Sequence, residues 1–188
     1  MNDDKLLIEK ALKGESAAFG QLVRRYQDRL YSSVVHVVAD AEEAEDIVQD
    51  AFIQALRKLD AFRGKSSFYT WLYRIAFNTA INRQRRRRPE VSIEHARETA
   101  GADPPDPIEQ PGERLMREER AQHIQQALAS ISEEYRAVLV LREIEGFDYE
   151  TIAGVLDVSV GTIRSRLHRA RSLMREQLRR IQIDSTSD

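Results

Sequence analysis

Small polar and basic side chains share one face of the segment 160–181. At about 100° per residue, that face presents Gly161, Ser165, His168, Arg169 and Ser172, with Thr162 and Arg164 beside it. Small residues let a helix approach a DNA groove closely, and arginine donates paired hydrogen bonds to guanine or binds phosphates. The chemistry that these residues favour is noncovalent recognition of nucleic acid. Because a solvated basic helix would carry the same charge, charge alone leaves both interpretations open.

The surrounding sequence predicts the element that positions this face. An apolar stripe runs along the same segment at steps of three and four residues: Val160, Ile163, Leu167, Ala170, Met174, Leu178 and Ile181. A shorter helix, capped by Asp148 and extending to about Leu156, precedes it, and only residues 157–159 join the two. Two helices joined by so short a turn indicate a helix-turn-helix motif. With this turn included, DNA recognition is favoured over a solvated face.

Aromatic and basic residues alternate in a second stretch, FRGKSSFYTWLYRIAFNTAINRQRRRR. Residues 63–88 hold eight bases and no acid. Such interleaving suits single-stranded nucleic acid, because rings stack on exposed bases while cations follow the backbone. Aromatic residues at helical spacing are more often core, and the periodicity assigns Trp71, Ile75 and Phe77 inward. The loop before the helix, together with Phe68 and Tyr69, is therefore the expected base-contacting part.

A third stretch, DAEEAEDIVQDAFIQAL, combines acids with apolar residues. Residues 40–50 hold six acids and no base. Asp46, Asp50 and Ile53 form a stripe at four- and three-residue steps, with Gln49 beside it. A solvated acidic face would show the same charges. The apolar residues beside these acids favour a surface that docks on another protein, because such contacts need desolvated anchors.

Nothing in the sequence supports a catalytic or metal site. The chain has no Gly-rich nucleotide loop, no H-E-x-x-H, no nucleophile elbow and no Cys. The four His are scattered, so we expect no metal, no other cofactor and no enzymatic activity. The first residues lack the basic end of a signal peptide, and no stretch reaches about 18 apolar residues. We therefore expect a cytoplasmic protein that does not insert into membranes.

Four of the five Pro fall in one acidic stretch, GADPPDPIEQPGE. A segment so poor in apolar residues cannot bury enough surface to offset the entropy of ordering, so we expect a flexible linker. The linker divides the chain into an N-terminal unit at 1–97, the linker itself at 98–113 and a C-terminal unit at 114–188.

Both units are expected to be all-α, because apolar residues recur three and four apart and no alternating strand pattern occurs. In the N-terminal unit we predict helices at 5–13, 16–38, 41–59 and 67–86. In the C-terminal unit we predict helices at 112–130, 133–145, 148–156 and from 160 onward. Asp40 and Ser132 are the expected N-caps of the third and sixth of these helices. The predicted fold is two small helical domains joined by a flexible, acidic, Pro-rich linker.

Three stretches, in this order, resemble the extracytoplasmic-function sigma factors of bacterial RNA polymerase. They are DAEEAEDIVQDAF, FRGKSSFYTWLYRIAFNTA and SEEYRAVLVLREIEGFDYETIAGVLDVSVGTIRSRLHRAR. Each alone is moderately specific, whereas together they are highly specific and cover nearly the whole chain. The resemblance implies a sigma-70-family initiation factor that performs no chemistry itself. Sigma region 2 would form the N-terminal unit and sigma region 4 the C-terminal unit.

The same resemblance implies roles for individual residues. The surface that docks on the polymerase clamp would contain Asp46, Gln49, Asp50 and Ile53. Melted bases of the minus-ten promoter element would be captured by Lys65, Ser66, Ser67, Phe68, Tyr69, Arg74, Asn78, Asn82 and Arg83. The duplex minus-thirty-five element would be recognised by Thr162, Arg164, Ser165, His168, Arg169 and Arg171.

The resemblance also implies the partners. Core RNA polymerase would contact the protein through its clamp and flap regions, and promoter DNA would be bound by both units. Family members are often held inactive by an anti-sigma factor that covers both polymerase-binding faces, which makes such a factor a further candidate partner. The acidic linker would follow the polymerase, where its acids mimic nucleic acid. We expect a monomer when the protein is not bound to polymerase.

Two other functions stay open on the residues alone. A helix-turn-helix repressor or activator would act without polymerase, but such proteins usually dimerise on palindromic sites, and no dedicated dimer helix is evident here. A recombinase would need a nucleophile and clustered arginines on a mixed fold, whereas the N-terminal unit is predicted to be all helix. The aromatic and basic stretch favours the sigma-factor interpretation over both.

Overall fold

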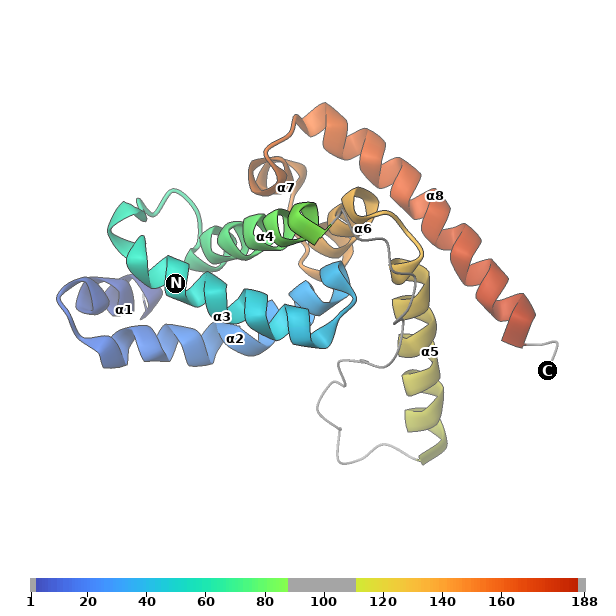
Figure 1. The fold of residues 1–188 in the computed structure, drawn as a ribbon, viewed down its shortest axis with the longest axis horizontal. Helices are drawn as coiled ribbons and strands as arrows, with labels where there is room; N and C mark the ends of the chain where they lie inside the picture. The colour runs from blue at the N-terminus through green and yellow to red at the C-terminus, as the bar shows by residue number, and fades with distance from the viewer. Residues whose placement is uncertain (1–2, 88–110, 186–188) are drawn as a thin grey trace.

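The computed structural model describes residues 3–87 and 111–185, and all the regular elements among these residues are helical (Figure 1). This confirms the all-α prediction. The predicted domain boundary at residue 97 and most of the predicted linker lie outside the described residues. The last linker residues belong to a helix, because α5 (Pro111–Ala129) begins at Pro111. Proline suits the first turn of a helix, where its missing N–H donor is not needed.

The N-terminal unit consists of helices whose bounds lie within two residues of the predicted ones. They are α1 (Asp3–Leu12), α2 (Ser16–Val38), α3 (Ala41–Arg57), the 3-10 turn η1 (Leu59–Ala61) and α4 (Phe68–Arg87). Gly14 follows α1 with a φ of 93°, a conformation that glycine adopts without strain. Asp40 caps α3, since its Oδ1 accepts a hydrogen bond from Glu43 N at 2.9 Å.

The C-terminal unit contains α5, α6 (Glu133–Leu139), the π-helical turn η2 (Val140–Ile144), α7 (Tyr149–Leu156) and α8 (Val160–Ser185). Asp148 Oδ1 accepts a hydrogen bond from Thr151 N at 2.7 Å and so caps α7. Residues 157–159 then turn the chain into α8, which gives the predicted helix-turn-helix. Ser132 stands at the N-cap position of α6 but forms no side-chain cap hydrogen bond. The sequence pattern also did not predict the π-helical turn.

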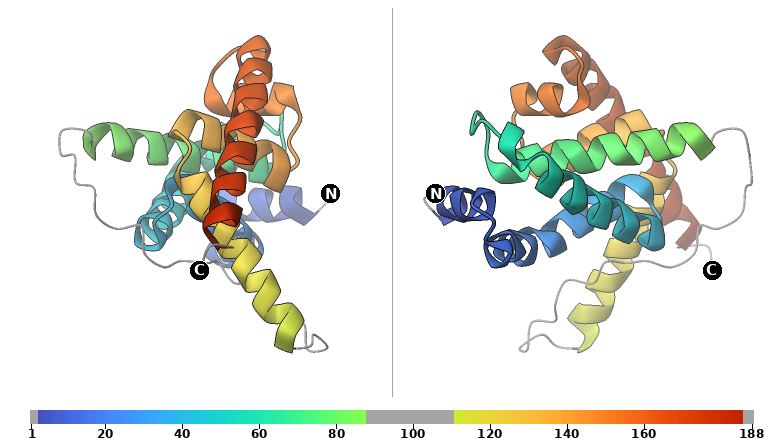
Figure 2. Two further views of the ribbon diagram at one scale, coloured as in Figure 1. Left: turned by 90° about the vertical axis from the view of Figure 1, so that its right-hand side faces the viewer. Right: turned by 60° about the vertical axis from the view of Figure 1, so that its left-hand side comes forward.

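The two units pack directly against each other (Figures 1 and 2). Helices α2, α3 and α4 contact one another in the N-terminal unit, and α8 contacts α5, α6 and α7 in the C-terminal unit. Between the units, α6 and η2 lie against α2, while α7 lies against α4. Helix α4 is therefore enclosed on one side by its own unit and on another by α7.

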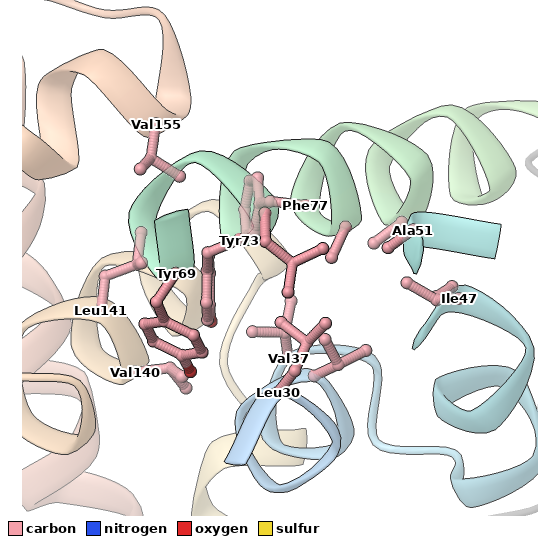
Figure 3. Close-up of a cluster of buried hydrophobic side chains, with 14 of the residues drawn as sticks. Leu30, Val37, Ile47, Ala51, Tyr69, Tyr73, Phe77, Val140, Leu141 and Val155 are labelled. Carbon is pink, nitrogen blue, oxygen red and sulfur yellow. The ribbon is translucent and has the colours of Figure 1, made fainter. Parts of the chain in front are cut away.

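A single cluster of buried apolar side chains extends through both units. Figure 3 shows side chains from α2, α4, η2 and α7 in this cluster: Leu30, Val37, Tyr69, Tyr73, Phe77, Val140, Leu141 and Val155. The Phe147 ring adds to the junction, with its centroid 6.3 Å from that of Tyr69 and 5.8 Å from that of Tyr73. Burial of apolar surface at this junction stabilises the packing of one unit on the other.

Candidate nucleic-acid interface

The helix-turn-helix is fixed at its turn by Ser159. The Ser159 Oγ accepts a hydrogen bond from Thr162 N at 3.1 Å and lies 2.8 Å from Thr162 Oγ1. One step further along α8, Ser165 Oγ donates to Thr162 O at 3.0 Å. The hydroxyls of Thr162 and Ser165 thus have local partners, which orient them at the start of the helix.

Helix α8 separates a buried stripe from an exposed basic face, as its periodicity predicts. Ile163, Leu167 and Ala170 are at most 1% exposed. Arg164, Ser165, His168 and Arg169 are exposed on the other side. Within the part of the chain that the structure describes, Arg164 and Arg169 have no ion-pair partner. Their guanidinium groups are available to an external base or phosphate.

Arg171 differs from these two arginines because it is paired inside its own unit. Its Nε and Nη2 donate to Glu143 Oε1 at 2.9 and 2.7 Å. The hydrogen bond to Glu143 raises the pKa of Arg171 above its ordinary value. A DNA phosphate would have to compete with that carboxylate, so Arg171 is a weaker candidate for DNA contact than Arg169.

The loop before α4 is exposed, and its last residue caps the helix. Lys65, Ser66 and Ser67 are all exposed. Ser67 Oγ accepts a hydrogen bond from Thr70 N at 3.0 Å and lies 2.8 Å from Thr70 Oγ1. The cap anchors one end of the loop to α4 and leaves Lys65 and Ser66 accessible to a ligand.

One face of α4 continues the polar surface of this loop. Arg74 and Asn78 are exposed and stand four residues apart, so they lie on the same side of the helix. Asn82 follows at the same spacing, but its side chain lies outside the described residues. The predicted contacts at Arg74 and Asn78 are therefore accessible together with those in the loop.

The rings of Phe68 and Tyr69 are buried, contrary to the exposure that we predicted. Phe68 is 2% exposed and Tyr69 is 4% exposed. The Phe68 ring packs against Tyr26 and Trp71, at centroid distances of 5.8 and 5.9 Å. Neither ring can stack on a base in this arrangement.

Phe68 and Tyr69 are buried where we predicted exposure because α4 is buried on two sides rather than one. The periodicity assigned Trp71, Ile75 and Phe77 inward, and Phe77 is indeed 4% exposed. Trp71 and Ile75 are only partly buried, whereas Tyr73 is 1% exposed. A single periodic stripe cannot describe a helix that packs on α2 and α3 and also beneath α7.

Arg83 joins two of the predicted sites. Its Nη1 lies 3.0 Å from Asp46 Oδ2, and its Nη2 lies 2.5 Å from Asp50 Oδ2. The hydrogen bonds to both carboxylates raise the pKa of Arg83. A cation predicted to contact the minus-ten strand thus neutralises acids that were predicted to dock on polymerase.

A groove of about 700 Å³ lies between α2 and α3. Asp46, Gln49 and Ile53 line it on the α3 side, while Asp50 is absent from its lining and is turned to Arg83. Ile53 is 43% exposed, and Leu56, which also lines the groove, is 52% exposed, so two large apolar side chains of α3 lie together at this surface. The groove has acids beside an apolar lining, as a protein-docking surface requires.

Sequence reasoning missed the other wall of this groove. Val23, Gln27 and Tyr31 of α2 line it opposite α3. They recur four residues apart, but no prediction from the sequence assigned them to a binding surface. Only the packing of α2 on α3 reveals the second wall.

Sequence reasoning also missed a buried carboxylate between the two units. The Glu145 side chain is 2% exposed. It accepts hydrogen bonds from Ser33 Oγ, from Tyr69 Oη at 2.8 Å and from Arg29 Nη2 at 2.9 Å. Burial, followed by the Glu145 carboxylate, raises the pKa of the Tyr69 hydroxyl well above its ordinary value. The donors lie more than 70 residues away along the chain, so no local pattern marks Glu145.

Among residues 3–87 and 111–185, no group of three or more His, Asp or Glu side chains could hold a metal ion. None of the helices in these ranges is long and apolar enough to span a bilayer.

Known families match both units of the chain. The Sigma-70 region 2 model matches residues 22–90, and the Sigma-70, region 4 model matches residues 121–174. The RNA polymerase sigma-H factor of Pseudomonas aeruginosa is 43% identical over 180 residues, covering 93% of each chain. The ECF RNA polymerase sigma-E factor of Escherichia coli K12 is 43% identical over 175 residues, covering 89% of this chain and 90% of the relative.

Two solved structures resemble the whole arrangement. The sigma factor RpoE from Bartonella quintana, in complex with the anti-sigma factor NepR, has a TM-score of 0.68 and 28% identity, covering 86% of this chain and 96% of that one. CnrH, in complex with the cytosolic domain of CnrY, has a TM-score of 0.64 and 27% identity, covering 94% of this chain and 97% of that one. Both similarities extend over the two units together.

The fold and both family matches define a bacterial transcription initiation factor. The chain belongs to the extracytoplasmic-function sigma factors of the sigma-70 family. It directs promoter-specific initiation by RNA polymerase, with regions 2 and 4 binding the minus-ten and minus-thirty-five elements. The family predicted from the sequence is confirmed, and the repressor and recombinase alternatives are set aside.

Proposed function

We propose that the exposed face of α8 recognises the minus-thirty-five element as duplex DNA. Arg164, His168 and Arg169 would reach base edges or phosphates from a helix in the major groove. Thr162 and Ser165 keep the start of the helix narrow, so that it approaches the groove closely. Arg171 contributes a phosphate contact only after it leaves Glu143. The support for this assignment is the exposure of the first three side chains.

The loop at 63–67 and the adjoining face of α4 capture the melted minus-ten strand. Lys65 and Arg74 supply charge to the backbone, while Ser66 and Asn78 supply hydrogen bonds to bases. Ser67 orients the loop through its cap on α4. Phe68 has a structural role in this proposal, because its ring belongs to the core of region 2.

The groove between α2 and α3 docks on the clamp of core polymerase. Ile53 is the apolar anchor, with Asp46 and Gln49 beside it and Asp50 at the adjoining edge. An exposed apolar residue ringed by polar groups is typical of a protein interface. Region 4 makes the second contact, on the polymerase flap.

The chain acts as a monomeric specificity subunit without chemistry or a cofactor of its own. Its two regions correspond to residues 1–97 and 114–188, with the acidic linker at 98–113 following the polymerase between them. Because it works with RNA polymerase on the chromosome, it acts in the cytoplasm.

An anti-sigma factor is a further partner in this proposal. Both similar solved structures are complexes, one with the anti-sigma factor NepR and the other with the cytosolic domain of CnrY. A protein that covers the groove between α2 and α3 would compete directly with polymerase for Ile53.

The observation that carries the proposal is that the exposed basic face of α8 and the exposed loop before α4 belong to different regions of the chain. A transcription assay tests it with the purified chain, bacterial core polymerase and a pool of genomic promoter fragments. We expect starts that depend on this protein and map to fragments sharing both elements. The proposal would be contradicted if the protein bound duplex DNA but neither bound polymerase nor directed transcription starts.

A further inference from the structure

We propose that the C-terminal half of α8 binds the phosphates that flank the minus-thirty-five element, through Arg175 and Arg179. The ligand is the sugar-phosphate backbone of duplex DNA, which these arginines contact without reading its sequence. The match to the Sigma-70, region 4 model ends at residue 174, so it includes neither arginine. The inference rests on the proposed function, because it extends the face of α8 that recognises the element.

Helix α8 continues well beyond the residues proposed to contact bases. It runs without a break for 26 residues, which is about 39 Å at about 1.5 Å per residue. Figure 1 shows it as one uninterrupted helix along the outer edge of the molecule. Ile163, Leu167 and Ala170 are buried and fix the first half in the core of region 4. The first half therefore sets the direction in which the second half extends.

The two arginines lie on the face that carries the recognition residues. Arg164 and Arg169 mark the edges of an arc of about 140° on the helix surface, at about 100° per residue. On the same scale, Arg175 lies about 20° and Arg179 about 60° inside that arc. His168 lies inside it as well, two turns before Arg175. A docked helix that turns this arc towards DNA therefore also turns both later arginines towards it.

The dimensions of the major groove bring both guanidinium groups close to phosphates. The first residues of a recognition helix contact base edges, in a groove that is about 12 Å wide. Arg175 lies about 10.5 Å along the helix axis from His168, and Arg179 about 16.5 Å, at about 1.5 Å per residue. Side chains on a helix lean towards its N-terminus, which brings each guanidinium back over the preceding turn. Arg175 thus reaches the rim of the groove, and Arg179 reaches phosphates just outside it.

Both arginines are exposed and carry unbalanced charge. Neither Arg175 nor Arg179 has an ion-pair partner in the part of the chain that the structure describes. Glu176 is the acid nearest to them in sequence, but its Oε1 lies 2.5 Å from Arg180 Nη2. Like charges four residues apart on a helix repel each other. An anion that binds between the two arginines would remove this repulsion.

Duplex DNA is the partner that both position and charge favour. The arc continues directly from the face that recognises the minus-thirty-five element. Between residues 172 and 179 it holds only polar side chains, namely Ser172, Arg175, Glu176 and Arg179. A protein interface needs apolar anchors, and the exposed Ile183 follows only after this stretch. Arginine without an apolar neighbour is the chemistry of a phosphate contact.

Salt titrations test this contact. The full-length chain, bound to core polymerase, would be titrated with a duplex that carries a mapped minus-thirty-five element and its flanks but no minus-ten element. Each phosphate contact adds about 0.9 to the slope of log affinity against log salt concentration. The double variant Arg175→Ala, Arg179→Ala should therefore have a slope about 1.8 smaller in magnitude, which makes the affinity lost between about 50 and 200 mM salt about tenfold less. Its preference for the element over a scrambled sequence should not change.

A matched variant and modified DNA identify the contact. The double variant Lys10→Ala, Lys13→Ala removes two exposed cations from α1 and the turn after it, so it changes the net charge equally. Its slope should equal that of the unchanged protein. Neutral methylphosphonates in place of the flanking phosphates should weaken binding of the unchanged protein and have no further effect on the α8 variant. Circular dichroism would check that each variant keeps its helices.

Two results would overturn the phosphate contact. The α8 variant could keep the slope of the unchanged protein, or it could lose affinity for core polymerase alone, which would make this stretch a protein contact. The proposed function is judged separately, by whether the unchanged protein prefers the minus-thirty-five duplex to the scrambled one. Absence of that preference would reject recognition of the element by α8. A retained preference with an unaltered slope would reject the phosphate contact alone.

Discussion

Helices α4 and α8 both carry residues proposed to contact promoter DNA, but the fold buries them differently. On α8 one stripe is buried, and Arg164 and Arg169 remain exposed opposite it. On α4 two sides are buried, so Tyr69 is hidden beneath region 4 and Arg83 is held by acids of α3. In a helix at the edge of a fold, the face that its periodicity assigns to solvent stays exposed. In a helix between two domains, some residues that a local pattern assigns to solvent are buried.

The largest expected effect tests the burial of α4 on both sides. Tyr73→Ala should lower the free energy of unfolding by about 3–5 kcal/mol, because a large ring leaves a cavity between α2 and α7. Urea denaturation followed by circular dichroism measures this change. Arg74→Ala, on the exposed side of the same helix, should stay within about 0.5 kcal/mol of the unchanged protein. Equal losses in the two variants would contradict the enclosed position of α4.

The open face of α8 predicts a loss of specificity without a loss of stability. Arg169→Ala should reduce discrimination between promoter and random duplex by about 1–3 kcal/mol if the arginine contacts a base. Titration of both duplexes at one salt concentration measures the difference. Arg171→Ala serves as the comparison, since Glu143 already occupies its guanidinium. If Arg169→Ala weakened both duplexes equally, the residue would be a phosphate contact instead.

The link between α3 and α4 predicts a smaller effect on polymerase binding. Asp50→Arg should weaken the affinity for core polymerase about tenfold, or about 1.4 kcal/mol, because it reverses a docking charge and repels Arg83. Fluorescence anisotropy of the labelled chain with core polymerase would report this change. Asp60→Arg reverses another exposed acid, on η1, and should bind normally. Unchanged binding by Asp50→Arg would refute the docking assignment.

The smallest expected effect concerns the turn that positions α8. The hydrogen bonds from Thr151 lower the pKa of Asp148 below its ordinary value of 3.8. A carboxyl with a lowered folded pKa stabilises the protein above its unfolded pKa, and this contribution is lost as the pH falls through the folded pKa. Denaturation midpoints between about pH 5 and pH 2 should therefore fall less steeply in Asp148→Asn. A variant with the same pH profile as the unchanged protein would count against the cap.

The sequence predicted most of the local structure because local signals determine it. Asp40 and Asp148 cap α3 and α7 by accepting hydrogen bonds from backbone N–H groups three residues later in the chain. Such caps can be predicted from a few neighbouring residues. The stripe of α8 is likewise set by spacing within one helix, and its central residues are buried as expected. The exposed recognition face followed from the same spacing.

The contacts between the two units could not be predicted in this way. Glu145 has its partners 76 to 116 residues earlier in the chain, at Tyr69, Ser33 and Arg29. The second wall of the groove, formed by α2, also becomes visible only once α2 packs on α3. Both features depend on the tertiary fold, which periodicity within a single segment does not encode.

Site-specific crosslinking in an open promoter complex tests the central claim most directly. A photoreactive amino acid would replace Ser66 in one protein and Arg164 in another, and each would be bound to core polymerase on promoter DNA. The account predicts that the Ser66 position crosslinks to the melted minus-ten strand and the Arg164 position to the minus-thirty-five duplex. Crosslinks from both positions to the same element, or from the Ser66 position to duplex DNA alone, would contradict it.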